Sequence, residues 1–466
     1  MTFLKRLVIC LLLGCLLLTL AACGGSTNSS GPSGDTQTVQ EKPFTYIGLY
    51  IWDNAKDYFD FFKACGVNTL QLAERIWWFN SDTALERAQG LSRAIDGIHE
   101  KGMYVDLLFF SNLRQYHGPD DYDKDSGGIG VWFDPQDEQA LADKMFYVRQ
   151  TMEQCANADF FTVEAGDPGG MSAEMRAGTA EDFAAIVRAY AAAAAEVAPN
   201  VKVHANTWAL SAYGEHYPVS LDYRWWQQET EMTKAFTQIA GLIGSSVGIC
   251  LPCHDYYRDL CRNLWYHAKI WGEVEETPVA YPQVEDIAQL RRQGVNDLWL
   301  WPFNLLETDG SADYCATFTC NLRYVQQFLQ DVRPFGADGI MADWTWKACC
   351  GMAMNFYGYA RMAADPSATP AQVMREYAGF LAAPESVDTL TEIFTFIENH
   401  SAGDQKRLNR YVPDPLPCTL ASAEQALAAL DTVVPLTGSS FPLPEPIPDT
   451  FERIRARLEA LYQEGA

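Results

Sequence analysis

The stretch that decides the fold of this chain runs from Phe160 to Gly170 and reads Phe-Phe-Thr-Val-Glu-Ala-Gly-Asp-Pro-Gly-Gly. It starts as a short apolar strand and ends in two carboxylic acids, Glu164 and Asp167, before a proline and two glycines force a tight loop. Because a strand holds its last side chains rigidly, we predict that both acids face a pocket. The alternative is that Asp167 caps the next turn and Glu164 forms a structural ion pair.

Seven other apolar runs have the same β-type character, and segments with helical period separate them. Several of these segments end in a glycine just before the next strand, as at Gly66, Gly102 and Gly294, where glycine accepts the left-handed cap conformation. The predicted strands are Tyr46–Tyr50, Thr69–Leu72, Tyr104–Phe109, Phe160–Val163, Val201–His204, Val247–Leu251, Asp297–Trp301 and Gly339–Ala342.

This alternation of strand and helix predicts an α/β protein with a (β/α)8 TIM barrel, which we expect over residues 44–350. A doubly wound dinucleotide-binding sheet lacks its main support, because no Gly-x-Gly-x-x-Gly motif follows the first strand. The strand pattern fades after Gly351. Residues 351–466 therefore predict a helical C-terminal region with proline-rich interruptions.

Acidic, amide and aromatic side chains follow the predicted strands, at the end of the barrel where such folds carry their active sites. Indole rings stack on the C–H faces of sugars, and carboxylates, amides and arginine bind sugar hydroxyls. The pattern predicts a carbohydrate pocket, although any one tryptophan could instead be core and Asp53 could be a helix cap. The candidate substrate-binding residues are Trp52, Asp53, Glu74, Arg75, Asn112, Asn206, Trp208, His254, Trp301, Asn304 and Trp344.

Hydrolysis of a glycosidic bond needs a carboxylic acid that protonates the departing oxygen and a second carboxylate that attacks or activates water. The candidate acid is Asp167 or Glu164, because burial near aromatic rings would raise its pKa towards neutrality. Asp343 and Asp255, after the eighth and sixth predicted strands, are the candidates for the second carboxylate. Retention needs a carboxyl separation of about 5 Å and inversion about 6.5–9.5 Å, so the sequence leaves the stereochemistry open.

Two segments resemble the bacterial alpha-glucuronidases. Residues 161–170 look like the strand and turn that carry a Glu-Gly-Gln-Pro-Gly pattern with the glutamate as general acid in that family. Residues 353–371 resemble its post-barrel helix, in which an Asn-x-Tyr-x-x-Gly-Arg run precedes an Asp-Pro. The resemblance implies a distant barrel glycoside hydrolase with a related C-terminal extension. Aligned on Gly-x-Pro-Gly, Ala165 falls at the family's acid position, so glucuronate specificity is not carried over.

The N-terminus is typical of a bacterial lipoprotein signal. Lys5 and Arg6 precede an apolar run that ends in Leu20-Ala21-Ala22-Cys23, and a Gly- and Ser-rich linker over residues 24–43 follows. The resemblance implies cleavage before Cys23 and a lipid on its thiol. We therefore expect an extracytoplasmic protein that contacts the cell membrane through the Cys23 lipid alone.

Charge and cysteine content narrow the partners further. The formal net charge is −26, which argues against nucleic acid as a partner. Ten of the 13 cysteines follow Cys23, and an exported chain could join some as disulfides, with Cys250–Cys253, Cys315–Cys320 and Cys349–Cys350 as candidate pairs. Cys250-x-x-Cys253-His254 has no second half at zinc-site spacing, so we expect no metal, and no motif suggests a cofactor.

Two function classes fit these observations. The first is a surface-anchored glycoside hydrolase, with a variant in which the substrate's own acetamido group attacks. The second is a non-catalytic carbohydrate-binding lipoprotein. A peptidase or esterase is disfavoured, because neither Gly-x-Ser-x-Gly nor His-Glu-x-x-His occurs.

Overall fold

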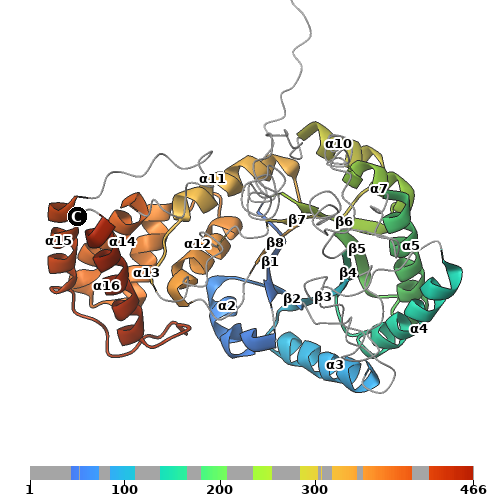
Figure 1. Ribbon diagram of the computed structural model, residues 1–466, viewed down its shortest axis with the longest axis horizontal. Coiled ribbons are helices and arrows are strands. Elements are labelled where there is room, and N and C mark those ends of the chain that lie inside the picture. The colour runs from blue at the N-terminus through green and yellow to red at the C-terminus, as the bar shows by residue number, and fades with distance from the viewer. Residues whose placement is uncertain are drawn as a thin grey trace, which may run out of the picture. The chain divides into compact units, whose positions relative to one another are not determined.

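The computed structural model describes residues 43–51, 53–72, 84–110, 137–164, 180–206, 235–253, 284–302, 306, 317–343, 350–400 and 419–464. Eight parallel strands form a closed barrel in chain order, and the last strand pairs with the first (Figure 1). The predicted TIM barrel is confirmed. Its strands are β1 (Tyr46–Ile51), β2 (Thr69–Leu72), β3 (Tyr104–Phe110), β4 (Phe160–Glu164), β5 (Lys202–Asn206), β6 (Val247–Pro252), β7 (Leu298–Trp301) and β8 (Gly339–Asp343).

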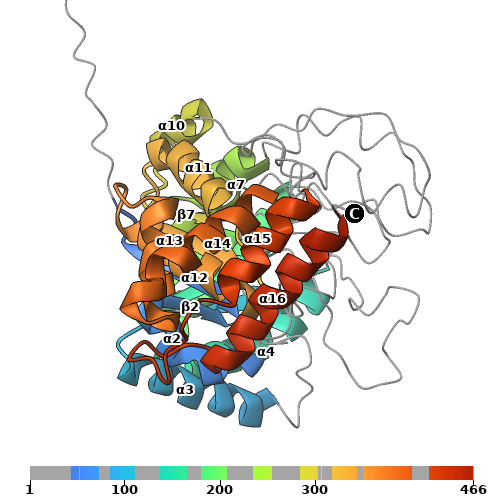
Figure 2. The same ribbon diagram turned by 90° about the vertical axis from the view of Figure 1, so that its left-hand side faces the viewer.

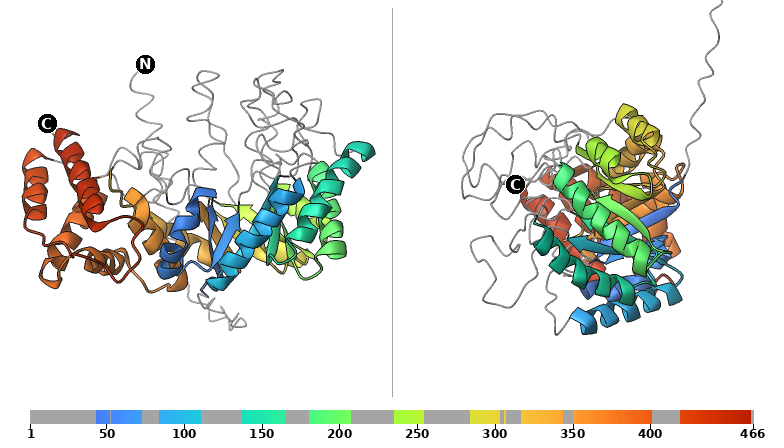
Figure 3. Two further views of the ribbon diagram at one scale, coloured as in Figure 1. Left: turned by 90° about the horizontal axis from the view of Figure 1, so that it is seen from below. Right: turned by 90° about the vertical axis from the view of Figure 1, so that its right-hand side faces the viewer.

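Helices lie along the outside of the strands, as the side views in Figure 3 show. Gly66, Gly102 and Gly294 have the positive φ angles expected of helix-ending caps, at 103°, 72° and 91°. The described helices between β1 and β8 are η1 (Asp53–Tyr58), α2 (Phe59–Cys65), α3 (Ala84–Glu100), α4 (Glu138–Gln154), α5 (Ala180–Val197), α7 (Ala235–Ile243), α10 (Val284–Arg292), α11 (Leu322–Val332) and η6 (Arg333–Phe335).

Large side chains fill the barrel interior because three strands carry glycine opposite them. A Cβ at Gly48 would lie 2.5 Å from Met341, one at Gly248 would lie 2.2 Å from His204, and one at Gly339 would lie 2.5 Å from Trp299. The interior is therefore a packed core and not a channel.

Aromatic rings close the amino end of this interior. Tyr46 stacks on Trp299 with ring centroids 5.0 Å apart and meets the edge of Phe160 at 5.1 Å. Phe160 in turn stacks on the His204 ring at 5.3 Å. Such ring pairs contribute about 0.5–1.5 kcal/mol each beyond the area that they bury. This end of the barrel is thus built for packing.

The helix after β8 completes the ring of helices. The short η7 (Cys350–Met352) leads into α12 (Ala353–Ala364), which packs against α11 on one side and α2 on the other. The buried Tyr359 hydroxyl lies 3.1 Å from the Gly48 oxygen of β1 and 3.0 Å from the Ile340 oxygen of β8. Helix α12 therefore packs on the barrel, although it lies beyond residue 350. The end of the barrel domain at residue 350 stays a prediction.

The remaining helices pack in sequence beside one another, as Figure 2 shows. Thr369 and Gln372 form a capping box that starts α13, and the stretch that resembles the glucuronidase post-barrel segment thus spans α12 and this helix start. No helix among the described residues is both long enough and apolar enough to cross a membrane. The elements are α13 (Pro370–Leu381), η8 (Pro384–Ser386), α14 (Val387–His400), α15 (Leu420–Leu430) and α16 (Ile447–Glu464).

The predicted signal peptide, the lipidation site Cys23 and most of the linker over 24–43 lie outside the described residues. They stay predictions.

The glycine at position 248 is expected to be essential for interior packing. In Gly248→Ala the new methyl would overlap the His204 ring, which Phe160 holds from the other side, so we expect a loss of about 1–3 kcal/mol in the free energy of unfolding. Gly97→Ala in α3 is the control, because nothing lies within 4 Å of its added Cβ. Urea denaturation should show this control unchanged or more stable; equal stability of both variants would contradict the packing argument.

Candidate functional site

Four of the predicted site residues are each the last residue of a barrel strand. Glu164 ends β4, Asn206 ends β5, Trp301 ends β7 and Asp343 ends β8. Because the strands are parallel and the barrel is closed, all four strand ends lie at the same rim (Figure 1). This is the end at which TIM barrels carry their active sites.

Of the other predicted catalytic and substrate-binding residues, the structure describes only Asp53. Asp53 is the first residue of η1, directly after β1 and Trp52. Those that lie outside the described residues are the candidate catalytic residues Asp167 and Asp255 and the candidate binding residues Trp52, Glu74, Arg75, Asn112, Trp208, His254, Asn304 and Trp344. Their roles stay predictions.

Glu164 and Asn206 form the centre of the described site. They are register partners on neighbouring strands, and the Asn206 side-chain Nδ2 donates a hydrogen bond of 3.1 Å to Glu164 Oε2. Both residues are buried, with 2% and 0% of their surface exposed. A carboxyl group at a strand end, oriented by an amide donor, is suited to proton transfer or nucleophilic attack.

Two aromatic rings form what we call the floor of the site. Tyr50 of β1 and Trp301 meet edge to face, with centroids 5.7 Å apart. Trp301 is 2% exposed and belongs to the group of buried residues inside the barrel. Trp301 is thus an interior residue at the end of β7. Its role in substrate binding stays a prediction.

A chain of buried hydrogen bonds runs beneath the floor. The Trp301 indole Nε1 donates to Gln71 Oε1 at 3.2 Å, and Gln71 Nε2 donates to Asp106 Oδ2 at 2.7 Å. Thr162 Oγ1 donates to the same Asp106 oxygen at 2.7 Å. Burial raises the pKa of the Asp106 carboxyl, although nearby His204 and the bonds from Thr162 and Gln71 act in the opposite direction.

Gln71, Asp106 and Thr162 are not among the site residues predicted from the sequence. A signal was present, because each interrupts an otherwise apolar predicted strand, and a polar side chain at a buried strand position needs a partner. The strand assignment alone does not say which polar residues meet across the barrel.

Two of the candidate disulfides are not formed. Cys250 and Cys320 are free buried thiols, and burial raises the pKa of each. Cys250 is therefore not joined to Cys253, nor Cys320 to Cys315. Among the residues that the structure describes, no three His, Cys, Asp or Glu side chains are grouped so that they could hold a metal ion.

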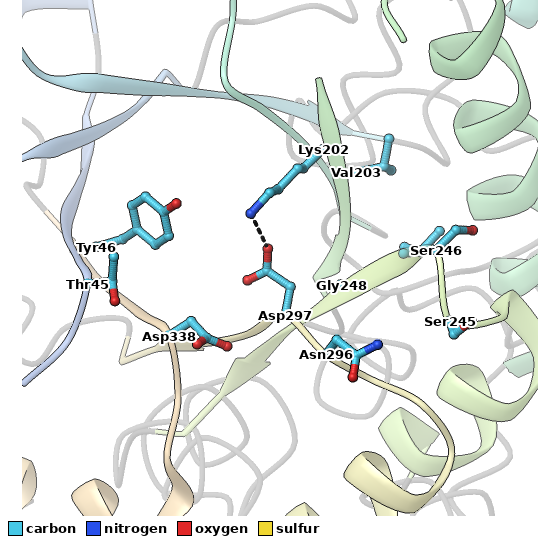
Figure 4. Close-up of a pocket in the computed structure, with 11 residues that line it drawn as sticks. Thr45, Tyr46, Lys202, Val203, Ser245, Ser246, Gly248, Asn296, Asp297 and Asp338 are labelled. Carbon is cyan, nitrogen blue, oxygen red and sulfur yellow. Dashed lines mark hydrogen bonds and ion pairs between the residues drawn. The ribbon is translucent and has the colours of Figure 1, made fainter. Parts of the chain in front are cut away.

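A hollow of about 430 Å³ lies at the opposite, amino end of the strands (Figure 4). Lys202 Nζ lies 3.2 Å from Asp297 Oδ2 there, and the buried His204 Nε2 lies 3.3 Å from the same oxygen, without the alignment of a hydrogen bond. Burial would raise the pKa of Asp297, but His204 and Lys202 outweigh it and hold that pKa below its ordinary value. The Lys202–Asp297 ion pair stabilises this end of the barrel.

The fold is similar to that of solved glycoside hydrolases. BtGH115A, a family GH115 4-O-methyl-alpha-glucuronidase with specificity for decorated arabinogalactans, superposes with a TM-score of 0.53 at 12% identity, over 91% of this chain and 55% of that one. CpGH84D gives a TM-score of 0.46 at 10% identity over 91% and 68% of the two chains. The endo-beta-1,4-mannanase from Thermotoga petrophila gives 0.40 at 12% identity over 70% and 78%.

No family model matches the chain, and no curated protein matches it in sequence. The sequence identity of this chain to these three structures is only 10–12%. At this identity the superposition on the GH115 enzyme establishes the barrel fold, and the chain spans only 55% of that enzyme's length.

Replacing Asn206 by aspartate should make stability depend on pH. Asn206→Asp would place a second carboxyl beside buried Glu164, so ionisation of the pair would be disfavoured and its pKa values raised. Acids with raised folded-state pKa values lose stability as pH rises above their unfolded values, near 4. We expect the variant to lose about 1–3 kcal/mol more than wild type between pH 5 and pH 8 in urea denaturation.

Asn157→Asp is the matched control for this experiment. Asn157 also donates to a carboxylate, Asp96 Oδ1 at 2.7 Å, but that contact is exposed, so water screens the added charge. A pH dependence as large in the control as in Asn206→Asp would contradict the buried placement of the Glu164–Asn206 pair.

The Asp297 ion pairs should stabilise the fold above acid pH. Because the folded-state pKa of Asp297 is lowered, its contribution is present above the unfolded value of about 4 and is lost as pH falls below it. Asp297→Asn should therefore cost on the order of 2 kcal/mol at pH 7, with the difference shrinking below pH 4. Asp60→Asn, at the exposed pair with Lys101, should change stability by less than about 0.5 kcal/mol. An equal effect of both substitutions in urea denaturation would overturn this assignment.

Proposed function

We propose that this protein is a glycoside hydrolase that cleaves an O-glycosidic bond with carboxyl groups at the carboxyl end of its barrel. The observation that carries the proposal is the Glu164–Asn206 pair, a buried carboxyl group at the end of β4 held by an amide from β5. The superposition on the GH115 enzyme supports the barrel on which such a site is built.

Glu164 supplies one of the two carboxyl groups that the reaction requires. Its hydrogen bond from Asn206 leaves it fixed at the rim, where it can protonate the departing glycosidic oxygen or attack the anomeric carbon. Asp343 ends β8 at the same rim, and it is a candidate for the second carboxyl together with Asp167 and Asp255. Asp167 remains the alternative acid.

The substrate belongs to the carbohydrates, and two observations decide which glycosides are tested first. Part of the sequence resembles alpha-glucuronidases, and one similar structure is an enzyme of that kind. Aryl α-glucuronides therefore lead a panel that also holds neutral α- and β-glycosides and N-acetylhexosaminides. The last group tests the variant in which the acetamido group of the substrate attacks.

The proposal includes the cellular location of the enzyme. The lipoprotein-type signal supports export, and the lipid on Cys23 would anchor the enzyme to the cell membrane, with the linker giving it reach towards extracellular glycans.

The second candidate function is carbohydrate binding without chemistry. Binding proteins for importers have two lobes and a hinge, whereas the described residues form one closed barrel, which favours the enzyme. Saturable binding of a glycan with no product from any member of the panel would establish the second function instead.

The test of the proposal is Glu164→Gln. The amide keeps an oxygen that can accept the Asn206 bond, so the fold should survive, while kcat should fall by about 10²–10⁴-fold because no proton or nucleophile remains. Release of aryl alcohol measures the rate, and Asp167→Asn is assayed in parallel. Glu153→Gln, at an exposed position of α4, is the control and should retain wild-type kcat. Wild-type turnover by both Glu164→Gln and Asp167→Asn would show that the acid does not lie at the end of β4 or in the segment that follows it.

A further inference from the structure

We propose that Asp106 is a positioning residue for the floor of the site, acting through Gln71 on the indole of Trp301. This inference rests on the proposed function only where it speaks of a substrate. Asp106 is buried and is the third residue of β3, four residues before the strand ends at the rim, so it lies too far below the rim to meet a ligand itself. It acts through two hydrogen bonds in series.

The direction of this chain is fixed by what each group can offer. The Asp106 carboxylate accepts hydrogen bonds and the Trp301 indole N–H only donates one. Gln71 lies between them and could point its amide either way. With Nε2 towards Asp106 at 2.7 Å, its Oε1 faces the indole nitrogen at 3.2 Å. The reverse orientation would set an oxygen against the carboxylate and a donor against a donor. Asp106 and the indole N–H thus favour the same orientation of the Gln71 amide, and the bond to Asp106 holds the amide in it.

One oxygen of Asp106 carries this role. Oδ2 accepts from both Gln71 and Thr162, whereas Oδ1 has no hydrogen-bond partner among the residues that the structure describes. An asparagine could place its oxygen at the Oδ2 position and keep both bonds. A leucine of similar volume could keep neither. Asp106→Asn therefore removes the charge and keeps the hydrogen-bond acceptor. Asp106→Leu removes the acceptor as well and keeps a similar volume.

The hydrogen bonds from Trp301 through Gln71 to Asp106 affect the rim of the barrel, because they orient the Trp301 ring. Trp301 is the last residue of β7, and its ring meets Tyr50 edge to face. With its N–H committed to Gln71, the indole is held at a fixed angle beneath the strand ends. A fixed floor sets the depth to which a sugar ring can enter, so its loss should weaken binding more than the chemical step.

The test uses the full chain labelled with ¹⁵N-tryptophan. The chain has 13 tryptophans, and Trp301→Phe identifies the indole N–H resonance of Trp301. In Asp106→Leu this resonance should move upfield and exchange faster with water, because its acceptor is no longer oriented. Asp106→Asn should leave it near its wild-type position. Thr162→Val removes the other bond to the same Asp106 oxygen and should also leave it unchanged.

A second variant keeps the test decisive if Asp106→Leu does not fold. Gln71→Met removes the amide and keeps its length, so it should shift the Trp301 resonance in the same way. An unchanged resonance in folded Asp106→Leu or in Gln71→Met would overturn the proposal. So would a shift in Asp106→Asn as large as in Asp106→Leu, since the charge and not the acceptor would then be responsible.

Kinetics on the best glycoside of the panel supply an independent readout. Asp106→Leu should raise KM by about three- to tenfold with kcat within about twofold, and Asp106→Asn should restore the wild-type KM. A fall in kcat alone would overturn the positioning role. If wild type cleaves no glycoside, the proposed function fails, while the indole resonance still decides whether Asp106 orients Trp301.

Discussion

The pairing of β8 with β1 is the constraint on which the rest of this structure depends. It joins residues 46–50 to residues 339–343 in parallel register and closes the sheet. Parallel pairing sets the ends of β4, β5, β7 and β8 along one edge, and closure bends that edge into a rim around one axis, although more than 170 residues separate the first of these ends from the last. The candidate chemistry is therefore a product of ring closure more than of any local motif.

The two ends of the barrel make opposite use of polar groups. At the amino end, Asp297 lies 3.2 Å from Lys202 Nζ and 3.3 Å from the buried His204 ring, next to a packed aromatic cluster. Nearer the carboxyl end, polar side chains are linked from donor to acceptor, from Trp301 through Gln71 to Asp106 and separately from Asn206 to Glu164. Burial makes each unpaired polar group costly, so such chains persist only where nearly every member finds a partner.

Much of the fold could be predicted from the sequence, because strand and cap signals are local. All eight strands lie within a residue or two of their predicted bounds, and the caps at Gly66, Gly102 and Gly294 have the expected conformation. The interior contacts could not be predicted in the same way. That Gln71 meets both Asp106 and Trp301 depends on the stagger between strands, which no single strand encodes. Trp301 illustrates the limit, because a tryptophan at a strand end has the same pattern whether it faces a ligand or the core.

The Tyr359 hydroxyl connects positions 311 residues apart in the chain, because it reaches the backbone of β1 from α12. Contacts this distant in sequence form late, since the loop they close must first be ordered at an entropic cost. The first strand has no permanent neighbour on its outer edge until the eighth strand and the helix behind it have been synthesised. A nascent chain of this protein consequently emerges with an unprotected strand edge for most of its length, and an edge of this kind is prone to pair with other chains.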